Sequence, residues 1–248
     1  MKRVVDILKS SWVVFWWMSA SFVMWLPIAL TGAVSRTGKL AFHICRAWVW
    51  LGKTICFATV QYEISPQIDR SRSYIIASNH QSLLDIPALM LMGFQFRWVL
   101  KKELGYIPLF GWALYLARHI FINRSSPKLA LKNMAMAMKK LPPGVSVAIF
   151  PEGTRADDGV LREFKIGGFL TAIESGLPIL PVTINGSWKR LPDKSSLSFV
   201  PGPIQVIAHP PVEVAGRSKK DIGALMEEVR SVIASRLDSN WPSPPAQG

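Results

Sequence analysis

The sequence predicts an α/β fold, in which a mostly parallel central sheet is flanked by helices and preceded by an N-terminal two-helix membrane-anchoring hairpin. From Ile64 onward, short apolar runs alternate with helical patterns, which is typical of a parallel sheet. Residues 11–35 contain no charged side chain, and a second apolar segment follows directly. A length of 248 residues suits one α/β domain with an anchor and is short for two catalytic domains.

The composition indicates a membrane surface as a partner. Half of the residues are hydrophobic although the formal net charge is +13, and an apolar, basic chain suits an anionic membrane. No zinc-finger, RNP or basic-zipper pattern organises the lysines and arginines, so nucleic acid is not expected as a partner. Cys45 and Cys56 cannot form a metal site alone and are expected to be free thiols. The sequence therefore predicts no metal and no bound cofactor, and it carries no signal for an oligomeric state.

Residues 1–62 are predicted to form the hairpin. A helix over residues 11–35 rises about 1.5 Å per residue and would be roughly 35 Å long, enough to cross a bilayer. The second segment, residues 40–60, is amphipathic, because one helical face collects the side chains of His43, Arg46, Trp50 and Lys53.

The basic residues between the two segments favour one orientation. If both helices crossed the bilayer, Arg36 and Lys39 would be translocated, against the usual retention of Lys and Arg on the cytoplasmic side. We therefore expect a hairpin embedded from one face of the membrane. A transmembrane hairpin, or a first helix packed on the domain, is the alternative.

The α/β domain is predicted over residues 63–237, and the tail over 238–248 is expected to be disordered. Strands are expected at residues 74–77, 96–100, 119–122, 145–150 and 179–184, with one or two more between 197 and 214. The prolines of the strand at 179–184 favour a sheet edge or an irregularity. Helices are expected at residues 87–93, 126–141, 165–175 and 222–233. The aromatic stretch at 106–115 is expected to face lipid.

A histidine and an aspartate follow the strand at 74–77. His80 and Asp85 lie where open α/β sheets bind ligands, and five residues on a continuous helix would separate the two side chains by about 140°. Their pairing therefore requires a bend before the helix near Pro87. A carboxylate on one ring nitrogen would fix the tautomer of His80 and allow the other nitrogen to accept a proton. The alternative is that Asp85 caps the helix and His80 is a polar loop residue.

Two further strand ends carry arginines. One strand runs into Arg124, and another runs into Glu152, Gly153, Thr154 and Arg155. The planar guanidinium groups of two arginines could hold one phosphate, and a glycine lets the backbone approach closely. Glu152 is expected to orient an arginine or a substrate hydroxyl. Each arginine alone is more often a surface ion-pair residue.

The sequence resembles the glycerolipid acyltransferases, the family typified by bacterial 1-acylglycerol-3-phosphate acyltransferase. Four blocks of the family occur in order, at residues 79–85 (the HX4D motif), 121–124, 150–155 and 177–182. One departure is Asn123, where the family often has Asp.

The resemblance implies a function at the membrane surface. His80 would take the proton from the free hydroxyl of lysophosphatidic acid, which then attacks the acyl thioester of acyl-CoA or acyl carrier protein. Asp85 would orient that histidine, and the acceptor phosphate would bind at Arg124, Glu152, Gly153, Thr154 and Arg155. The product would be phosphatidic acid, a phospholipid precursor. The resemblance also implies a bacterial inner-membrane location with the catalytic domain on the cytoplasmic face.

Other functions remain open from the sequence. The acceptor could be another lyso-lipid, such as a lyso-ornithine lipid or a lysophospholipid with a headgroup. A lipid hydrolase could use Ser82 or water, although the chain lacks a Gly-x-Ser-x-Gly elbow. A noncatalytic membrane-binding protein is the third alternative.

Overall fold

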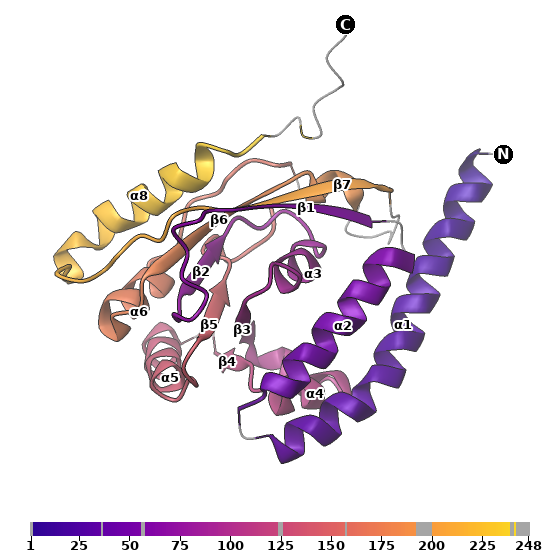
Figure 1. The fold of residues 1–248 in the computed structure, drawn as a ribbon, viewed down its shortest axis with the longest axis horizontal. Helices are drawn as coiled ribbons and strands as arrows, with labels where there is room; N and C mark the ends of the chain where they lie inside the picture. The colour runs from indigo at the N-terminus through magenta and orange to yellow at the C-terminus, as the bar shows by residue number, and fades with distance from the viewer. Residues whose placement is uncertain are drawn as a thin grey trace, which may run out of the picture.

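A seven-stranded sheet lies at the centre of the molecule (Figure 1). The computed structural model describes residues 2–35, 37–55, 58–123, 126–156, 158–191, 200–238 and 241. The strands are β1 (Ala58–Ile64), β2 (Ile75–Ser78), β3 (Gln95–Lys101), β4 (Ile120–Ile122), β5 (Val145–Ile149), β6 (Ile179–Asn185) and β7 (Gly202–Ala208). Their order across the sheet is β1-β7-β6-β2-β5-β3-β4. Strands β6 and β7 pair antiparallel and the other neighbouring strands pair parallel, so the predicted α/β fold with a mostly parallel central sheet is confirmed.

Helices cover both faces of this sheet. They are α1 (Lys2–Val34), α2 (Lys39–Ile55), α3 (Asp85–Met90), α4 (Phe110–Leu116), α5 (Pro127–Lys139), α6 (Gly167–Ser175), α7 (Ser187–Arg190) and α8 (Ile222–Ala234), with short 3-10 helices η1 (Lys102–Tyr106) and η2 (Lys219–Asp221). Side chains alternate along a strand, so β2 contributes to two separate cores. Ile76 packs with residues of α2 and α3, whereas Ile75 and Ala77 pack with residues of α5, α6 and α8.

One strand prediction is wrong in its position. Strand β6 contains Pro181, but it pairs with β2 on one side and β7 on the other, so it is not at an edge. Proline removes only its own N–H donor, while its carbonyl still accepts. The Pro181 carbonyl accepts the N–H of His209 at 3.0 Å, which keeps the interior position compatible with this residue.

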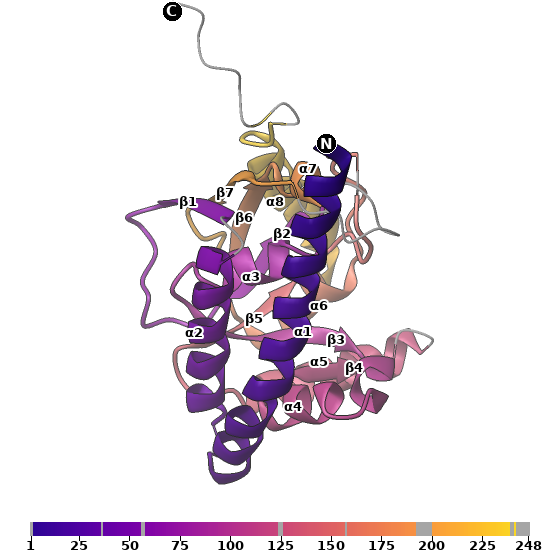
Figure 2. The same ribbon diagram turned by 90° about the vertical axis from the view of Figure 1, so that its right-hand side faces the viewer.

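Helices α1 and α2 run side by side along one flank of the domain (Figures 1 and 2). Their apolar contact joins Ile28 and Ala41 to Ala117, which directly follows α4. The side chain of Arg97 on β3 donates to the Thr37 carbonyl at 2.6 Å and so holds the turn between α1 and α2 against the sheet. No helix in the described ranges is both long enough and apolar enough to span a membrane.

The chain ends differ in how far the structure describes them. The expected domain boundary between residues 62 and 63 falls inside β1. This strand pairs with β7 along its whole length. Of the predicted tail, residues 239, 240 and 242–248 lie outside the described residues. The N–H of Asp238 donates to Asn185 at 2.9 Å, at the end of β6.

Candidate active site

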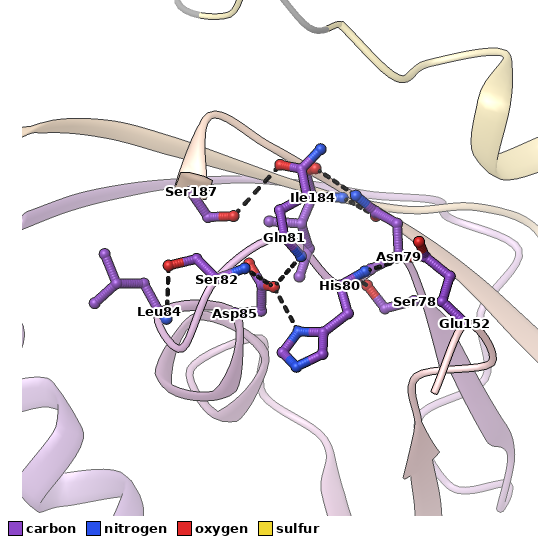
Figure 3. A network of polar contacts seen from close by, with 10 residues as sticks. All are labelled: Ser78, Asn79, His80, Gln81, Ser82, Leu84, Asp85, Glu152, Ile184 and Ser187. Carbon is purple, nitrogen blue, oxygen red and sulfur yellow. Dashed lines mark hydrogen bonds and ion pairs between the residues drawn. The ribbon is translucent and has the colours of Figure 1, made fainter. Parts of the chain in front are cut away.

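The loops after β2 and β5 meet at the carboxyl edge of the sheet (Figure 3). Asn79 directly follows β2, and its buried side chain bonds to the backbone of β6 where the strand pairing stops. Its Oδ1 accepts the N–H of Ile184 at 2.7 Å, and its Nδ2 donates to the carbonyl of the same residue at 2.9 Å. The His80 carbonyl accepts the N–H of Ala156 at 2.7 Å, which joins the two loops. Asn79 thus positions the residue that follows it, a role the sequence analysis missed.

His80 and Asp85 form the predicted pair. Their Nδ1 and Oδ2 atoms lie 2.8 Å apart, and Asp85 is fully buried at the start of α3. The same Oδ2 accepts the N–H groups of Gln81 and Ser82 at 2.7 Å each, so the loop bends around the carboxylate. Because a carboxylate accepts hydrogen bonds, Nδ1 carries the proton and Nε2 is left to accept one. Asp85 therefore both caps the bent loop and orients the imidazole.

A stack of aromatic rings supports one face of the His80 imidazole. The rings of His80 and Phe150 stack with centroids 3.8 Å apart and planes 9° apart. Phe150 stacks in turn on Trp98, at 5.4 Å between centroids. Stacking restricts rotation of the imidazole without using either ring nitrogen. Phe150 thus contributes to the geometry of His80 as a ring support.

Among the described residues, Glu152 bonds to the protein main chain and not to an arginine side chain. It is 3% exposed; its Oε1 accepts the N–H of His80 at 2.7 Å, and its Oε2 accepts the N–H of Arg162 at 2.9 Å. Burial raises the pKa of Glu152, while these two N–H groups act in the opposite direction. The carboxylate therefore links the loop that carries His80 to the segment after the Glu152–Arg155 run.

Four of the predicted site residues line one cavity, whereas Asp85 and Glu152 lie behind its wall. An apolar cavity of about 1450 Å³ is lined by His80, Gly153, Thr154 and Arg155, together with residues of α1, α2, α4, α5 and α6. Arg124 lies outside the described residues, so its predicted place beside Arg155 stays a prediction. His80 and Arg155 thus border the same cavity.

Lys165 is a cation of this cavity that the sequence analysis did not single out. Its side chain lines the cavity, and its N–H donates to the Pro151 carbonyl at 2.8 Å. Gly153 has a φ of 73°, and a Cβ at this position would lie 3.0 Å from the Lys165 Nζ. A side chain at Gly153 is therefore disfavoured by backbone and space together. Lys165 comes to this position only when the chain folds, because no motif spacing in the sequence connects it with Arg155.

His119 is a second lining residue that was missed. Its Nδ1 accepts the N–H of Trp98 at 3.1 Å, so the ring is neutral in the folded protein. Burial, together with the Arg97 guanidinium, lowers the pKa of His119 to about 3. A neutral histidine that already accepts a main-chain hydrogen bond is a structural part of the cavity wall.

Neither Ser82 nor Cys45 has the described contacts of an activated nucleophile. The Ser82 hydroxyl is buried and accepts the N–H of Leu84 at 3.4 Å, and no described hydrogen bond joins it to the His80 ring. Burial raises the pKa of the Cys45 thiol to about 11, so little of the reactive thiolate forms near neutrality. Cys56 lies outside the described residues. Among the residues that the structure covers, no group of three His, Cys, Asp or Glu side chains could hold a metal.

Comparisons with known proteins converge on one family. The family model described as "Acyltransferase" matches residues 59–185. A 1-acyl-sn-glycerol-3-phosphate acyltransferase of Pseudomonas aeruginosa is 36% identical over 231 residues, which cover 89% of this chain and 87% of that protein. The crystal structure of the 1-acyl-sn-glycerophosphate acyltransferase PlsC from Thermotoga maritima matches with a TM-score of 0.77 and 27% identity, over 95% of each chain.

A plant relative is longer than this chain. The chloroplastic 1-acyl-sn-glycerol-3-phosphate acyltransferase LPAT1 of Arabidopsis thaliana is 36% identical over 173 residues, which cover 70% of this chain. The match spans 47% of that protein, about half of its length.

Proposed function

Because the chain belongs to the acyltransferase family, we propose that it transfers a fatty acyl group from an acyl thioester to the sn-2 hydroxyl of lysophosphatidic acid. The product is phosphatidic acid, and the donor is acyl-CoA or acyl carrier protein. One observation carries this proposal: His80, which is paired with Asp85, borders the same apolar cavity as the cationic residues Arg155 and Lys165. Lipid substrates need such a combination, because they join an anionic headgroup to an apolar chain.

The reaction follows from the orientation of the His80 ring. Nε2 takes the proton from the acceptor hydroxyl as its oxygen attacks the thioester carbonyl, and Asp85 stabilises the imidazolium that forms. When the tetrahedral intermediate collapses, the C–S bond breaks and the imidazolium returns the proton to the departing thiolate. The acyl group passes directly to the acceptor, and the enzyme is unchanged at the end of the cycle.

The phosphate of the acceptor is assigned to the loop after β5. Arg155 and Lys165 supply positive charge to the cavity wall that Gly153 also lines. Thr154 adds a hydroxyl to the same wall of the cavity. Arg124 is assigned to this phosphate on the resemblance of its sequence block. Glu152 is proposed as a positioning residue in place of a ligand, because both carboxylate oxygens accept main-chain N–H groups.

The apolar part of the cavity is assigned to the acyl chains. Its lining includes Met24 and Ile28 of α1, Val49 of α2, and Leu131 and Met134 of α5. A volume of about 1450 Å³ exceeds the range of roughly 300–1,000 Å³ usual for small-ligand pockets. The two N-terminal helices are therefore part of the substrate site as well as part of the surface.

The hairpin is proposed to embed in one face of the membrane. Large apolar side chains are exposed on three neighbouring helices: Trp12, Phe15, Phe22, Val23, Leu26, Leu30 and Val34 on α1, Leu40, Trp50 and Leu51 on α2, and Phe110, Trp112 and Tyr115 on α4. These helices contact one another through α1, so their exposed residues belong to one flank of the molecule. Apolar surfaces of this extent mark interaction with a membrane or another protein. The bacterial inner membrane, with the catalytic domain on its cytoplasmic face, is the proposed location.

The test is acyl transfer to a panel of acceptors. Purified protein receives acyl-CoA or acyl carrier protein with lysophosphatidic acid, a lyso-ornithine lipid or lysophosphatidylethanolamine. We expect phosphatidic acid to form fastest, and His80→Ala to lower turnover by about 10² or more, because general-base catalysis is lost. Ser82→Ala should retain most of the activity, whereas its inactivity would support a serine hydrolase. Absence of transfer to every acceptor would refute the proposal, and preference for another lyso-lipid would refute the assigned acceptor.

A further inference from the structure

A second pocket lies on the side of α2 that faces β1 and α3. Its volume is about 430 Å³, and it is lined by His43, Arg46, Ala47, Trp50, Lys53, Tyr62 and Leu91. The α2 residues recur at spacings of three and four, so one helical face forms this wall. The opposite wall is fixed, because the Tyr62 hydroxyl donates to the carbonyl of Ala88 in α3 at 2.9 Å. The pocket is thus held between three elements of the fold.

The charge of this pocket is positive and uncompensated. Within the described ranges, its lining contains no Asp or Glu, and neither Arg46 nor Lys53 forms an ion pair or hydrogen bond. The third basic side chain, His43, is held by Gln95, with 2.7 Å between the two Nε2 atoms. Two cations that converge on a concave surface without a protein partner favour an anion, and a guanidinium favours phosphate in particular.

The surroundings of the pocket indicate which phosphate it meets. Trp50 belongs to its wall and is also exposed, and the apolar side chains of Leu40 and Leu51 on the same helix are exposed as well. A tryptophan beside apolar and basic residues is typical of the level at which lipid headgroups lie. The pocket therefore lies on the helix that also carries part of the exposed apolar flank.

We propose that the α2 pocket binds the phosphate of an anionic membrane phospholipid that is neither substrate nor product in the catalytic cycle. Arg46 and Lys53 supply the charge, and Trp50 packs on the glycerol region. The inference rests on the proposed attachment of the hairpin to a membrane. Because Lys53 also lines the large cavity, an occupied pocket would hold α2 at a defined depth beside the catalytic cavity.

The test measures binding of the full chain to vesicles without turnover. Wild-type protein is compared with Arg46→Gln/Lys53→Gln on vesicles of phosphatidylglycerol and of phosphatidylcholine. The matched control is Lys132→Gln/Lys139→Gln, which removes the same charge from exposed positions of α5. We expect the pocket variant to lose at least about tenfold in binding to phosphatidylglycerol, and the control to lose less than about threefold. Binding to phosphatidylcholine should be the same for all three proteins.

Three outcomes would overturn the proposal. Equal losses in the pocket variant and the control would show that vesicle binding depends on the overall positive charge and not on this pocket. Unchanged vesicle binding with a higher KM for acyl-CoA would assign the pocket to the phosphates of the donor. Unchanged behaviour in both assays would show that it holds no phosphate. Vesicle binding requires no acyl transfer, so a failure of the proposed enzyme activity leaves this test intact.

Discussion

Three neighbours fix His80 from different directions. Asp85 holds Nδ1, Phe150 covers one face of the ring, and Glu152 accepts the main-chain N–H. The first contact sets the tautomer, the second sets the ring plane and the third sets the position of the backbone. A base that must meet a hydroxyl within hydrogen-bond reach depends on all three.

Glu152→Gln should impair turnover more than acceptor binding. The amide of Gln offers one acceptor oxygen, so its NH2 group would face the N–H of His80 or of Arg162 and leave that donor without a partner. An unsatisfied buried donor costs about 1–3 kcal/mol, which corresponds to a roughly ten- to hundredfold fall in kcat if the cost falls on the placement of His80. Steady-state kinetics separate the outcomes, since a higher KM for lysophosphatidic acid with unchanged kcat would identify Glu152 as a direct ligand.

His119 should make the protein acid-sensitive. Its pKa is about 3 in the folded protein against 6.5 for an ordinary histidine, so folding excludes a proton. This contribution to stability is complete above pH 6.5 and is lost as the pH falls toward 3.

His119→Asn should reduce this acid sensitivity, because an amide oxygen can accept the Trp98 N–H without titrating. Denaturant unfolding between pH 6.5 and pH 4 checks the prediction. The free energy of unfolding should fall less steeply in the variant, by up to about 1.4 kcal/mol per pH unit. His209, whose pKa burial also lowers, is present in both proteins and cancels in the comparison. Equal slopes would contradict a neutral, buried His119.

At the scale of elements, sequence patterns predicted the helices, strands and bends that depend on neighbouring residues. The helix with Leu225, Val229 and Ile233 on one face is present as α8, and these side chains are buried. Strand β2 and the bend from His80 to Asp85 also follow from neighbouring residues. The edge prediction for β6 failed because sheet position depends on β7, whose paired residues lie 20 to 26 positions further along the chain.

The same distinction applies to the candidate site. His80, Asp85 and Arg155 carry chemistry that residue type and strand-end position reveal, and the structure brings His80 and Arg155 to one cavity. Lys165 and His119 were missed because their roles depend on folded contacts with Gly153 and Trp98. No period or motif spacing encodes those contacts.

Arg97 is predicted to couple the hairpin to the sheet. It is 1% exposed, donates to the carbonyls of Phe96 and Thr37, and lies over the ring of Phe42 in α2. Arg97→Met should keep the packing volume but remove the donor to the turn, so amides at residues 37–42 should exchange about tenfold faster, as expected when a hydrogen bond of about 1.4 kcal/mol is lost.

Hydrogen exchange followed by mass spectrometry measures the effect of the Arg97 change. Arg230→Met on α8 is the control, because this arginine is partly exposed and its ion pair among the described residues is a 3.9 Å contact with Glu227. Exchange that stays at the wild-type rate in the turn would show that apolar contacts alone hold the hairpin. Faster exchange across the whole sheet would indicate global destabilisation instead.

At the scale of the whole molecule, the apolar cavity and the apolar flank are built from the same helices. Residues of α1, α2 and α4 line the cavity with their inner faces and expose Leu30, Leu51 and Trp112 on their outer faces. With this flank embedded as proposed, a lipid would reach the cavity directly from the bilayer. Attachment of the protein to the membrane and entry of the lipid substrate would then depend on the same surface, so a change in that surface should impair both.

A triple change on this flank should release the protein from neutral vesicles without unfolding it. Leu30→Ser, Leu51→Ser and Trp112→Ser remove half-exposed side chains, so each should cost about 1 kcal/mol of membrane binding and together about a hundredfold in partitioning. Serines at Leu129, Met136 and Val200, which are exposed on other elements, are the matched control and should bind normally. Flotation with phosphatidylcholine vesicles measures binding, and the Tm should change by only a few degrees. Equal binding by both triple variants would place the membrane contact elsewhere. If the flank variant loses vesicle binding but still acylates a short-chain, water-soluble acceptor, the flank serves attachment and the cavity remains intact.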